Sequence, residues 1–199
     1  MLEIDTDELA PEHYPVWWDQ EFKITWSFLD LSENNQLLWE VGFDERRNTV
    51  CSIEIGLKLF PAITYQYQTE TIETNLTAGA GMYWLEIDDD VPVERGYERG
   101  DLNNMTAAAV FSAQLRFNLT DKLSIMGKAQ TWRDQEWLEN KYSAEISFDT
   151  NNQFKKNQLL FSVDYTEYNL DVYQINSTQL HVLGWDHDIA FRATLQLPI

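Results

Sequence analysis

The sequence predicts an all-β fold: a closed antiparallel β-barrel of about twelve strands, or about ten if two expected corners are only kinks or bulges. Apolar and polar residues alternate with a period of two through most of the chain after residue 20, as they do in half-buried strands. Short polar stretches rich in Asn, Asp, Ser and Thr separate these segments, as turns require. No segment of helix length carries the apolar spacing of a helix.

The clearest pair of strands lies between Met105 and Trp132. In its first half, apolar side chains alternate with small and polar ones such as Gln114 and Arg116. Its second half repeats the pattern, and a turn is expected over Asn118–Lys122. The pair therefore has one apolar face and one polar face.

The other strands are expected on the same grounds. Their apolar positions span Phe22–Phe28, Leu37–Phe43, Cys51–Leu59, Ile63–Tyr67, Leu76–Trp84, Tyr142–Phe148, Leu159–Tyr165, Leu170–Ile175, Gln179–Trp185 and Ile189–Leu197. Pro61 cannot donate a ladder hydrogen bond, so a corner or interruption is expected there. A second corner is expected at Thr166–Asn169. If either is only a kink or bulge, the strand count falls toward ten.

The connections between the strands differ in length. Residues 1–20 lack alternation and are predicted to be a mostly irregular N-terminal segment, followed by a barrel over residues 21–199. Turns are expected at Ser32–Asn35, Asp44–Asn48, Thr69–Thr74 and Asp149–Asn157, and longer loops at Asp88–Asp101 and Arg133–Asn140.

Composition excludes several classes of protein. The 199 residues suit one domain, and 33 acidic against 14 basic residues give a net charge of −19, which argues against a nucleic-acid partner. The acidic clusters at Leu2–Glu12 and Asp88–Asp101 fit solvated ends and loops. A mean hydropathy of −0.42 and the lack of an apolar run of about 18 residues exclude a transmembrane helix. The single cysteine, Cys51, excludes a disulfide within the chain.

Alternation does not say which face of the sheet points inward, but four further features favour an apolar outer face, as in a transmembrane barrel. The apolar faces carry no charge, and a charge at mid-bilayer would cost about 2–4 kcal/mol. The polar faces carry only isolated charges, although the chain has 33 acidic residues. The longer connections fall at one end of the strands. Aromatic residues gather near strand ends, as membrane-interface girdles do: Trp17, Trp18, Tyr83, Trp84, Trp132, Trp137, Tyr142, Tyr165, Tyr168 and Trp185.

The turn Asn118–Ser124 and the terminal strand Ile189–Leu197 resemble those of bacterial outer-membrane β-barrel proteins. The resemblance is one of pattern over about residues 20–199, and within this class it is closest to a solitary autotransporter-type barrel domain. It implies a location in the outer membrane of a Gram-negative bacterium, with residues 1–20 in the periplasm. It also implies contact with membrane lipid and lipopolysaccharide, and with an envelope protein as a candidate partner. Members of the class commonly end in Phe, whereas this chain ends Leu197-Pro198-Ile199. Met1 is not followed by a signal peptide, so an exported form would have lost one.

Two functions are expected from this fold. The first is a small porin-like channel for ions or small solutes, with acidic rims favouring cations. Its expected pore-lining residues are Lys23, Glu40, Glu54, Lys58, Gln114, Arg116, Lys128, Glu145 and Arg192. The alternative is a barrel plugged by its own side chains or by residues 1–20, serving as an anchor or scaffold. No cofactor is expected.

Other constellations carry weaker hypotheses. Asp186-His187-Asp188 could activate water as an Asp–His pair does in some hydrolases, although the same residues are ordinary in a turn. Ser177 precedes His181 by four residues without the local motif of an acyl hydrolase. The carboxylates of Asp88–Asp101 could bind Ca²⁺, and external loops of such barrels meet divalent cations in any case. An enzyme is therefore the least favoured of the three functions.

Overall fold

The computed structural model describes residues 2–4, 16–48, 53–87, 103–149, 158–169 and 187–196. These residues form an all-β structure whose strands pair in chain order in one antiparallel sheet. The strands are β1 (Leu2–Ile4), β2 (Val16–Ser32), β3 (Asn35–Asn48), β4 (Ile53–Gln68), β5 (Ile72–Ile87), β6 (Asn103–Thr120), β7 (Leu123–Arg133), β8 (Trp137–Asp149), β9 (Gln158–Tyr168) and β10 (His187–Gln196). In the part of the chain described, no helix could span a membrane.

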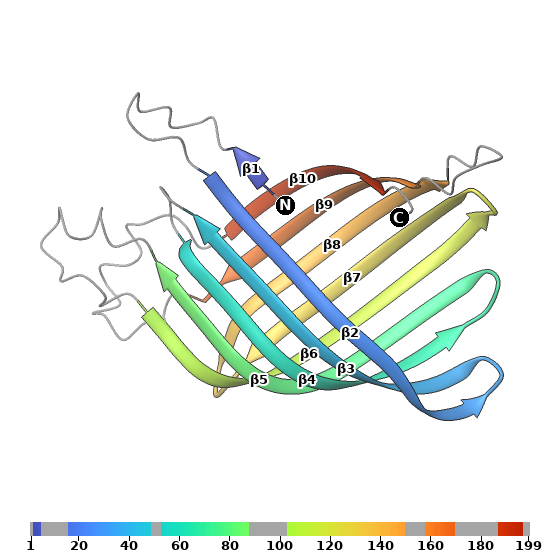
Figure 1. The fold of residues 1–199 in the computed structure, drawn as a ribbon, viewed down its shortest axis with the longest axis horizontal. Coiled ribbons are helices and arrows are strands. Elements are labelled where there is room, and N and C mark those ends of the chain that lie inside the picture. Colours follow the sequence, from blue (N-terminus) through green and yellow to red (C-terminus); the bar gives the residue numbers. More distant parts are fainter. Residues whose placement is uncertain are drawn as a thin grey trace, which may run out of the picture.

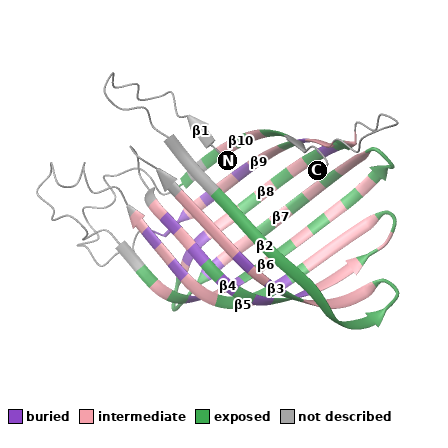
Figure 2. Cartoon of the chain, viewed as in Figure 1, coloured by how far each residue is buried: buried purple, intermediate pink, exposed green. Residues whose placement is uncertain are grey.

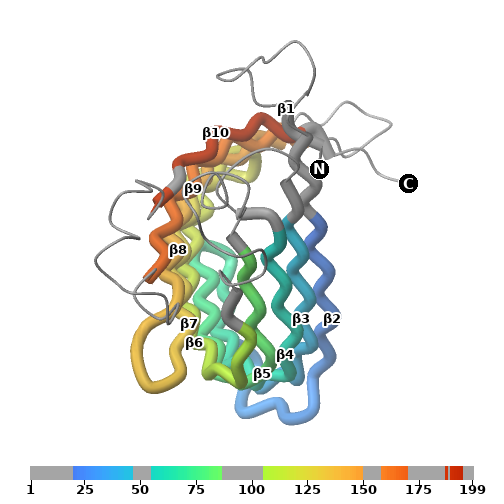
Figure 3. Tube along the Cα trace, turned by 90° about the vertical axis from the view of Figure 1, so that its left-hand side faces the viewer, coloured from blue at the N-terminus to red at the C-terminus, as the bar shows by residue number. Residues whose placement is uncertain are grey.

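The sheet of long strands β2–β10 curls strongly (Figures 1 and 3). Side chains of strands that are not neighbours in the sheet meet across its hollow. Lys58 of β4 pairs with Glu139 of β8, and Arg46 of β3 donates a hydrogen bond to the Tyr168 hydroxyl of β9 at 3.2 Å. Contacts between strands four to six places apart in the sheet require that β2–β4 and β8–β10 face each other.

The curled sheet is not closed in the residues described. β10 pairs with β9, β2 pairs with β3 and with the three residues of β1, and no ladder between described residues joins β10 to β1 or β2. Because neighbouring strands alternate in direction, β2 and β10 run the same way. The all-β class is confirmed, whereas a closed barrel is not established by these strands.

The apolar face of the sheet points outward and the polar face points into the hollow. Burial alternates along the strands (Figure 2). Phe191 and Phe22 are 78% and 59% exposed, whereas Glu139 and Glu40 are 1% and 4% exposed. This arrangement is the reverse of a soluble protein, where large apolar side chains lie inside.

The hairpin of β6 and β7 forms as predicted. The register pairs Phe117 with Ile125 and Gln114 with Lys128, so each face of β6 continues on β7. The turn narrows to Asp121-Lys122, where the Thr120 hydroxyl accepts hydrogen bonds from the backbone N–H groups of Lys122 and Leu123 at 3.2 and 3.1 Å.

Pro61 does not interrupt its strand, and the corner predicted there is wrong. β4 runs from Ile53 to Gln68, and the β4–β5 register is the same before and after Pro61. Pro61 has no backbone N–H to donate to a neighbouring strand, so continuity of β4 depends on close packing against β5. Gly79 and Gly81 of β5 allow this packing because they have no side chain. A Cβ added at Gly81 would lie 2.1 Å from the Leu59 carbonyl oxygen and 2.6 Å from the Phe60 Cβ. The described residues form ten strands, but these are not the ten that were predicted, because they include β1 within residues 1–20 while Leu170–Ile175 and Gln179–Trp185 lie outside the described residues.

Three expected connections are also wrong in extent, because strands continue through them. β3 continues through Asp44–Asn48, β8 already begins at Trp137, and β2 begins at Val16 inside the segment expected to be irregular. Asp44, Arg46 and Glu139 in these places line the hollow of the sheet, so their polarity did not mark loops. The loop at Asp88–Asp101 and the strands expected over Leu170–Ile175 and Gln179–Trp185 lie outside the described residues.

Candidate functional site: the interior cleft

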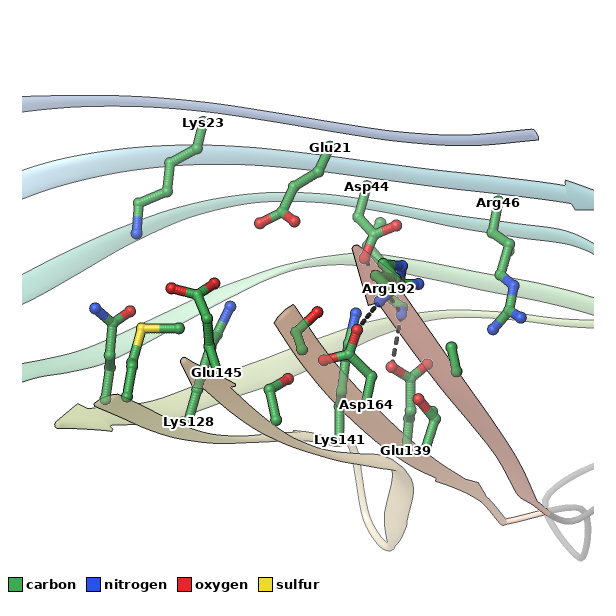
Figure 4. Close-up of a pocket in the computed structure, with 18 of the residues that line it drawn as sticks. Glu21, Lys23, Asp44, Arg46, Lys128, Glu139, Lys141, Glu145, Asp164 and Arg192 are labelled. Atoms are coloured by element: carbon green, nitrogen blue, oxygen red, sulfur yellow. Dashed lines mark hydrogen bonds and ion pairs between the residues drawn. The ribbon is translucent and has the colours of Figure 1, made fainter. Parts of the chain in front are cut away.

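The hollow of the curled sheet holds a cleft of about 500 Å³ that is lined by every strand from β2 to β10. We call it the interior cleft. Its described lining consists mainly of charged and polar side chains: Glu21, Lys23, Asp44, Arg46, Gly56, Lys58, Leu85, Gln114, Arg116, Met126, Lys128, Glu139, Lys141, Ser143, Glu145, Ser162, Asp164, Thr166, Tyr168, Ala190 and Arg192. Figure 4 shows Glu21 and Lys23 of β2 pointing toward Lys128, Lys141 and Glu145 on the opposite wall.

Lys58 forms the most buried charge network in the cleft. Its Nζ lies 2.7 Å from Glu139 Oε1 and 3.7 Å from Asp44 Oδ2. Tyr83 donates its hydroxyl to the other oxygen of Glu139 at 3.2 Å, and the Lys58 Nζ also lies 5.7 Å from the centre of the Tyr83 ring. A buried carboxylate needs such partners, because an unpaired charge away from water is costly.

A second network lies on β2, β3, β4 and β5. The Lys23 Nζ lies 2.7 Å from Glu40 Oε2, which also accepts a hydrogen bond from the Thr64 hydroxyl at 2.9 Å. The Thr64 and Thr77 hydroxyls are 2.8 Å apart. Glu40, although 4% exposed, is therefore held by a cation and a hydroxyl.

Two further ion pairs lie on the β6–β10 wall of the cleft. Arg116 Nη2 lies 3.5 Å from Glu145 Oε1, and Arg192 pairs with Asp164 of the neighbouring strand. The buried Arg116 Nε has no hydrogen-bond partner among the described residues. These pairs fix the orientation of the side chains that form the wall.

Lys128 and Lys141 differ from the other cleft cations. Neither forms an ion pair or a hydrogen bond with a described residue. Glu21, Glu40 and Asp44 interact electrostatically with one or both lysines, but over distances longer than that of an ion pair. The β7–β8 wall thus presents two ammonium groups without direct partners.

The charge of the cleft is opposite in sign to that of the chain. Seven basic residues line it, which is half of the 14 in the chain, against five of the 33 acidic residues. The described lining has an excess of two positive charges, whereas the whole chain carries −19. Basic side chains are therefore concentrated in the interior.

An aromatic cluster of Phe60, Tyr83 and Trp132 fills the hollow beside the cleft. The Phe60 and Trp132 rings meet edge to face with centroids 5.2 Å apart, and the Tyr83 and Trp132 centroids are 5.7 Å apart. Trp132 is 1% exposed, and its Nε1 has no partner among the described residues. The expectation that Tyr83, Trp132 and Tyr168 belong to outer girdles is wrong, because all three are buried on the inner face. Their ring size suggested the membrane interface, but their positions in the alternation match the polar face.

The structure brings eight of the nine expected pore-lining residues to the inner face. Seven line the interior cleft: Lys23, Lys58, Gln114, Arg116, Lys128, Glu145 and Arg192. Glu40 lines an adjoining cavity of about 40 Å³, and the Glu54 side chain lies outside the described residues. That these residues line a pore remains a prediction.

Sequence reasoning missed six charged residues of the cleft: Glu21, Asp44, Arg46, Glu139, Lys141 and Asp164. Asp44 and Arg46 lie in the turn predicted at Asp44–Asn48, Glu139 lies in the loop predicted at Arg133–Asn140, and Lys141 falls between that loop and the strand predicted from Tyr142. Asp164 lies between Val163 and Tyr165, so a strict application of the period of two would have found it.

The other candidate sites receive little support. His187 and Asp188 begin β10, and the His187 ring lies 5.9 Å from the ring of Tyr165. Asp186, Ser177, His181, Cys51 and the carboxylates expected to bind Ca²⁺ at Asp88–Asp101 lie outside the described residues. Among the residues described, no group of three or more His, Cys, Asp or Glu side chains could hold a metal ion.

Comparison with known proteins found no matching family model, no matching curated protein and no matching solved structure. The function must therefore be argued from the sheet and the cleft.

Proposed function

We propose that the chain is a transmembrane β-barrel that forms a small channel for ions or small solutes. The observation that carries the proposal is the reversed polarity of the sheet. Large apolar side chains such as Phe111, Leu115 and Ile125 are exposed on the outer face, and charged side chains such as Glu139 are buried inside. Lipid is the solvent that suits this outer face, and a polar interior is the usual counterpart.

The channel function is supported by the cleft. Its lining comes from nine strands around the hollow and contains ion pairs rather than apolar filling. A passage for solutes through a membrane needs such polar groups, because they replace part of the water around the solute.

A spanning sheet also needs closed edges, because unpaired N–H and C=O groups are costly in lipid. Direct pairing of β2 with β10 would be parallel, since both run in the same direction. The short strand β1 is antiparallel to β2 and brings the number of strands to ten. An even number permits antiparallel closure, which is the rule in bacterial barrels. We therefore propose that closure involves the segment of β1.

Outer-membrane residence follows from this proposal, since β-barrels of this kind belong to the outer membrane of Gram-negative bacteria. Membrane lipid and lipopolysaccharide would then cover the apolar face, with divalent cations at the external loops and an envelope protein as a candidate partner. Heat-modifiable migration on a gel, after reconstitution in lipid, tests whether a membrane barrel forms. Stability as a monomer without detergent would contradict it.

Single-channel conductance in planar bilayers tests the channel. We expect discrete openings, and we expect Ser143→Trp to reduce them because this residue lines the cleft. Ala144→Trp is the matched control, because the side chain of Ala144, next to Ser143 in the chain, is exposed on the outer face. An inserted, heat-modifiable protein without conductance would refute the channel.

The aromatic cluster favours a second candidate, a plugged barrel that serves as an anchor or scaffold. Phe60, Tyr83 and Trp132 fill part of the hollow, and Lys58 and Glu139 lie against Tyr83. If this cluster is a plug, the wild-type protein is silent in bilayers and Trp132→Ala opens it. Conductance that is equal in both proteins would exclude a plug at Trp132.

A further inference from the structure

The interior cleft combines an excess of positive charge with two lysines that have no direct partner. We propose that it is a binding site for a small solute carrying two or more negative charges on carboxylate or phosphate groups. The proposal rests on the cleft itself and deepens the proposed channel by naming the class of solute that would occupy it.

The first step is the charge balance. Five of the seven cations of the cleft already have partners: Lys23, Lys58, Arg116 and Arg192 pair with carboxylates, and Arg46 donates to Tyr168. Lys128 and Lys141 are the cations that remain available. When Glu40, which pairs with Lys23 from the adjoining cavity, is counted with the carboxylates of the lining, the described residues keep an excess of one positive charge, and the two lysines supply two ammonium groups for an anion.

The second step is the placement of the two lysines. Lys128 is paired in register with Ser143 of β8, and Lys141 lies two residues before Ser143 on the same inner face. Diagonal neighbours of this kind lie about 7–8 Å apart at the backbone, within reach of one ligand for side chains of this length. Ser143 also lines the cleft and offers a hydroxyl donor between them.

The third step is size and surroundings. A volume of about 500 Å³ is in the usual range for small-molecule sites. The cleft is walled by protein, so an ammonium–anion contact is screened less than on a surface. The carboxylates that oppose binding are Glu21, which faces the two lysines from β2 (Figure 4), and Glu40 and Asp44, which act on one or both lysines at longer range.

The interior cleft is proposed to bind anions, whereas acidic rims are expected to favour cations. The acidic run at Asp88–Asp101 lies outside the described residues, whereas the interior cleft is described and basic. A solute must pass the interior, so the cleft is the place where its charge is selected.

Titration calorimetry on the detergent-solubilised full chain tests the site with two probes, inorganic phosphate and succinate. We expect at least one probe to bind, and Lys128→Gln/Lys141→Gln to weaken it about tenfold or more for each lysine removed. The charge-matched control is Lys122→Gln/Arg133→Gln, which removes two exposed cations outside the cleft lining and should leave affinity unchanged. Glu21→Gln should tighten binding.

The two probes distinguish the ligand group: tighter binding of phosphate assigns phosphate-bearing solutes, and tighter binding of succinate assigns carboxylates. Binding of neither probe at millimolar concentration, or equal loss in the cleft and control variants, would overturn the site. If the double variant does not fold, each single lysine variant is measured, and unchanged affinity in both has the same meaning. The measurement needs no conductance, so a silent protein that binds the probe would refute the channel and leave the site intact.

Discussion

The side chain of Lys58 shows how one residue can depend on the curl of the whole sheet. It lies between Asp44 of the neighbouring strand β3 and Glu139 of β8, which is four strands away in the sheet. Glu139 is 1% exposed and accepts hydrogen bonds from Lys58 and Tyr83 in the cleft. Removing the cation would leave a buried carboxylate with one neutral donor.

We therefore expect Lys58→Met to lower the free energy of unfolding by about 3–5 kcal/mol, the usual cost of breaking a buried ion pair from one side. The double variant Lys58→Met/Glu139→Leu should recover most of this loss, because it also removes the buried carboxylate and leaves only the more exposed Asp44 without Lys58. Urea unfolding in lipid vesicles measures both. Lys122→Met, in the exposed turn after β6, is the control. Equal stability of the single and double variants would contradict the coupling.

At the scale of the element, the pairing of β4 with β5 depends on two glycines, Gly79 and Gly81, that lie against the residues on either side of Pro61. A Cβ at Gly79 would lie 2.5 Å from the Pro61 carbonyl oxygen, and one at Gly81 would lie 2.1 Å from that of Leu59. Both clashes involve backbone atoms, which cannot rotate away. The close approach of these strands keeps β4 continuous through a residue that lacks an N–H group.

Gly81→Ala should therefore destabilise the protein by about 1–3 kcal/mol, as overpacking does, because the strands must separate. Gly127→Ala is the matched control: nothing lies within 4 Å of the added Cβ, and a small stabilisation of about 0.4–1 kcal/mol is expected from the less flexible unfolded chain. Thermal unfolding of the two variants side by side measures the difference. A Gly81→Ala protein as stable as the control would show that the strands can separate freely.

At the scale of the whole molecule, the reversed polarity of the sheet distinguishes lipid from water as its solvent. Leu115 lies on the outer face of β6 and is 40% exposed, and its neighbour Gln114 lines the interior cleft. The same substitution at these adjacent positions therefore samples the two surfaces of the sheet.

In lipid, Leu115→Arg should cost about 2–4 kcal/mol, whereas Gln114→Arg adds a charge to an interior that already holds charges and should cost less. In water, Leu115→Arg would be a surface change within about 0.5 kcal/mol. Unfolding from vesicles, followed by Trp fluorescence, separates these outcomes. A neutral Leu115→Arg would exclude lipid contact at this face.

The sequence by itself determined the all-β class, the β6–β7 hairpin and the face of most strand residues, because a period of two is a local property of each strand. Nine residues are expected on the inner face from alternation alone, and eight of them line the interior cleft or the adjoining cavity. The sequence predicts a loop at some polar strand residues, such as Glu139, because polar residues occur both in turns and on an inner face.

The tertiary structure alone decided which charges meet. Lys58 and Glu139 are 81 positions apart, and their contact depends on the curl of the sheet and on the register of every strand between them. The same curl gathers half of the basic residues of an acidic chain into one cleft, and it leaves Lys128 and Lys141 without direct partners among the described residues. Alternation fixes a face for each side chain, but only the curvature of the sheet brings distant faces together.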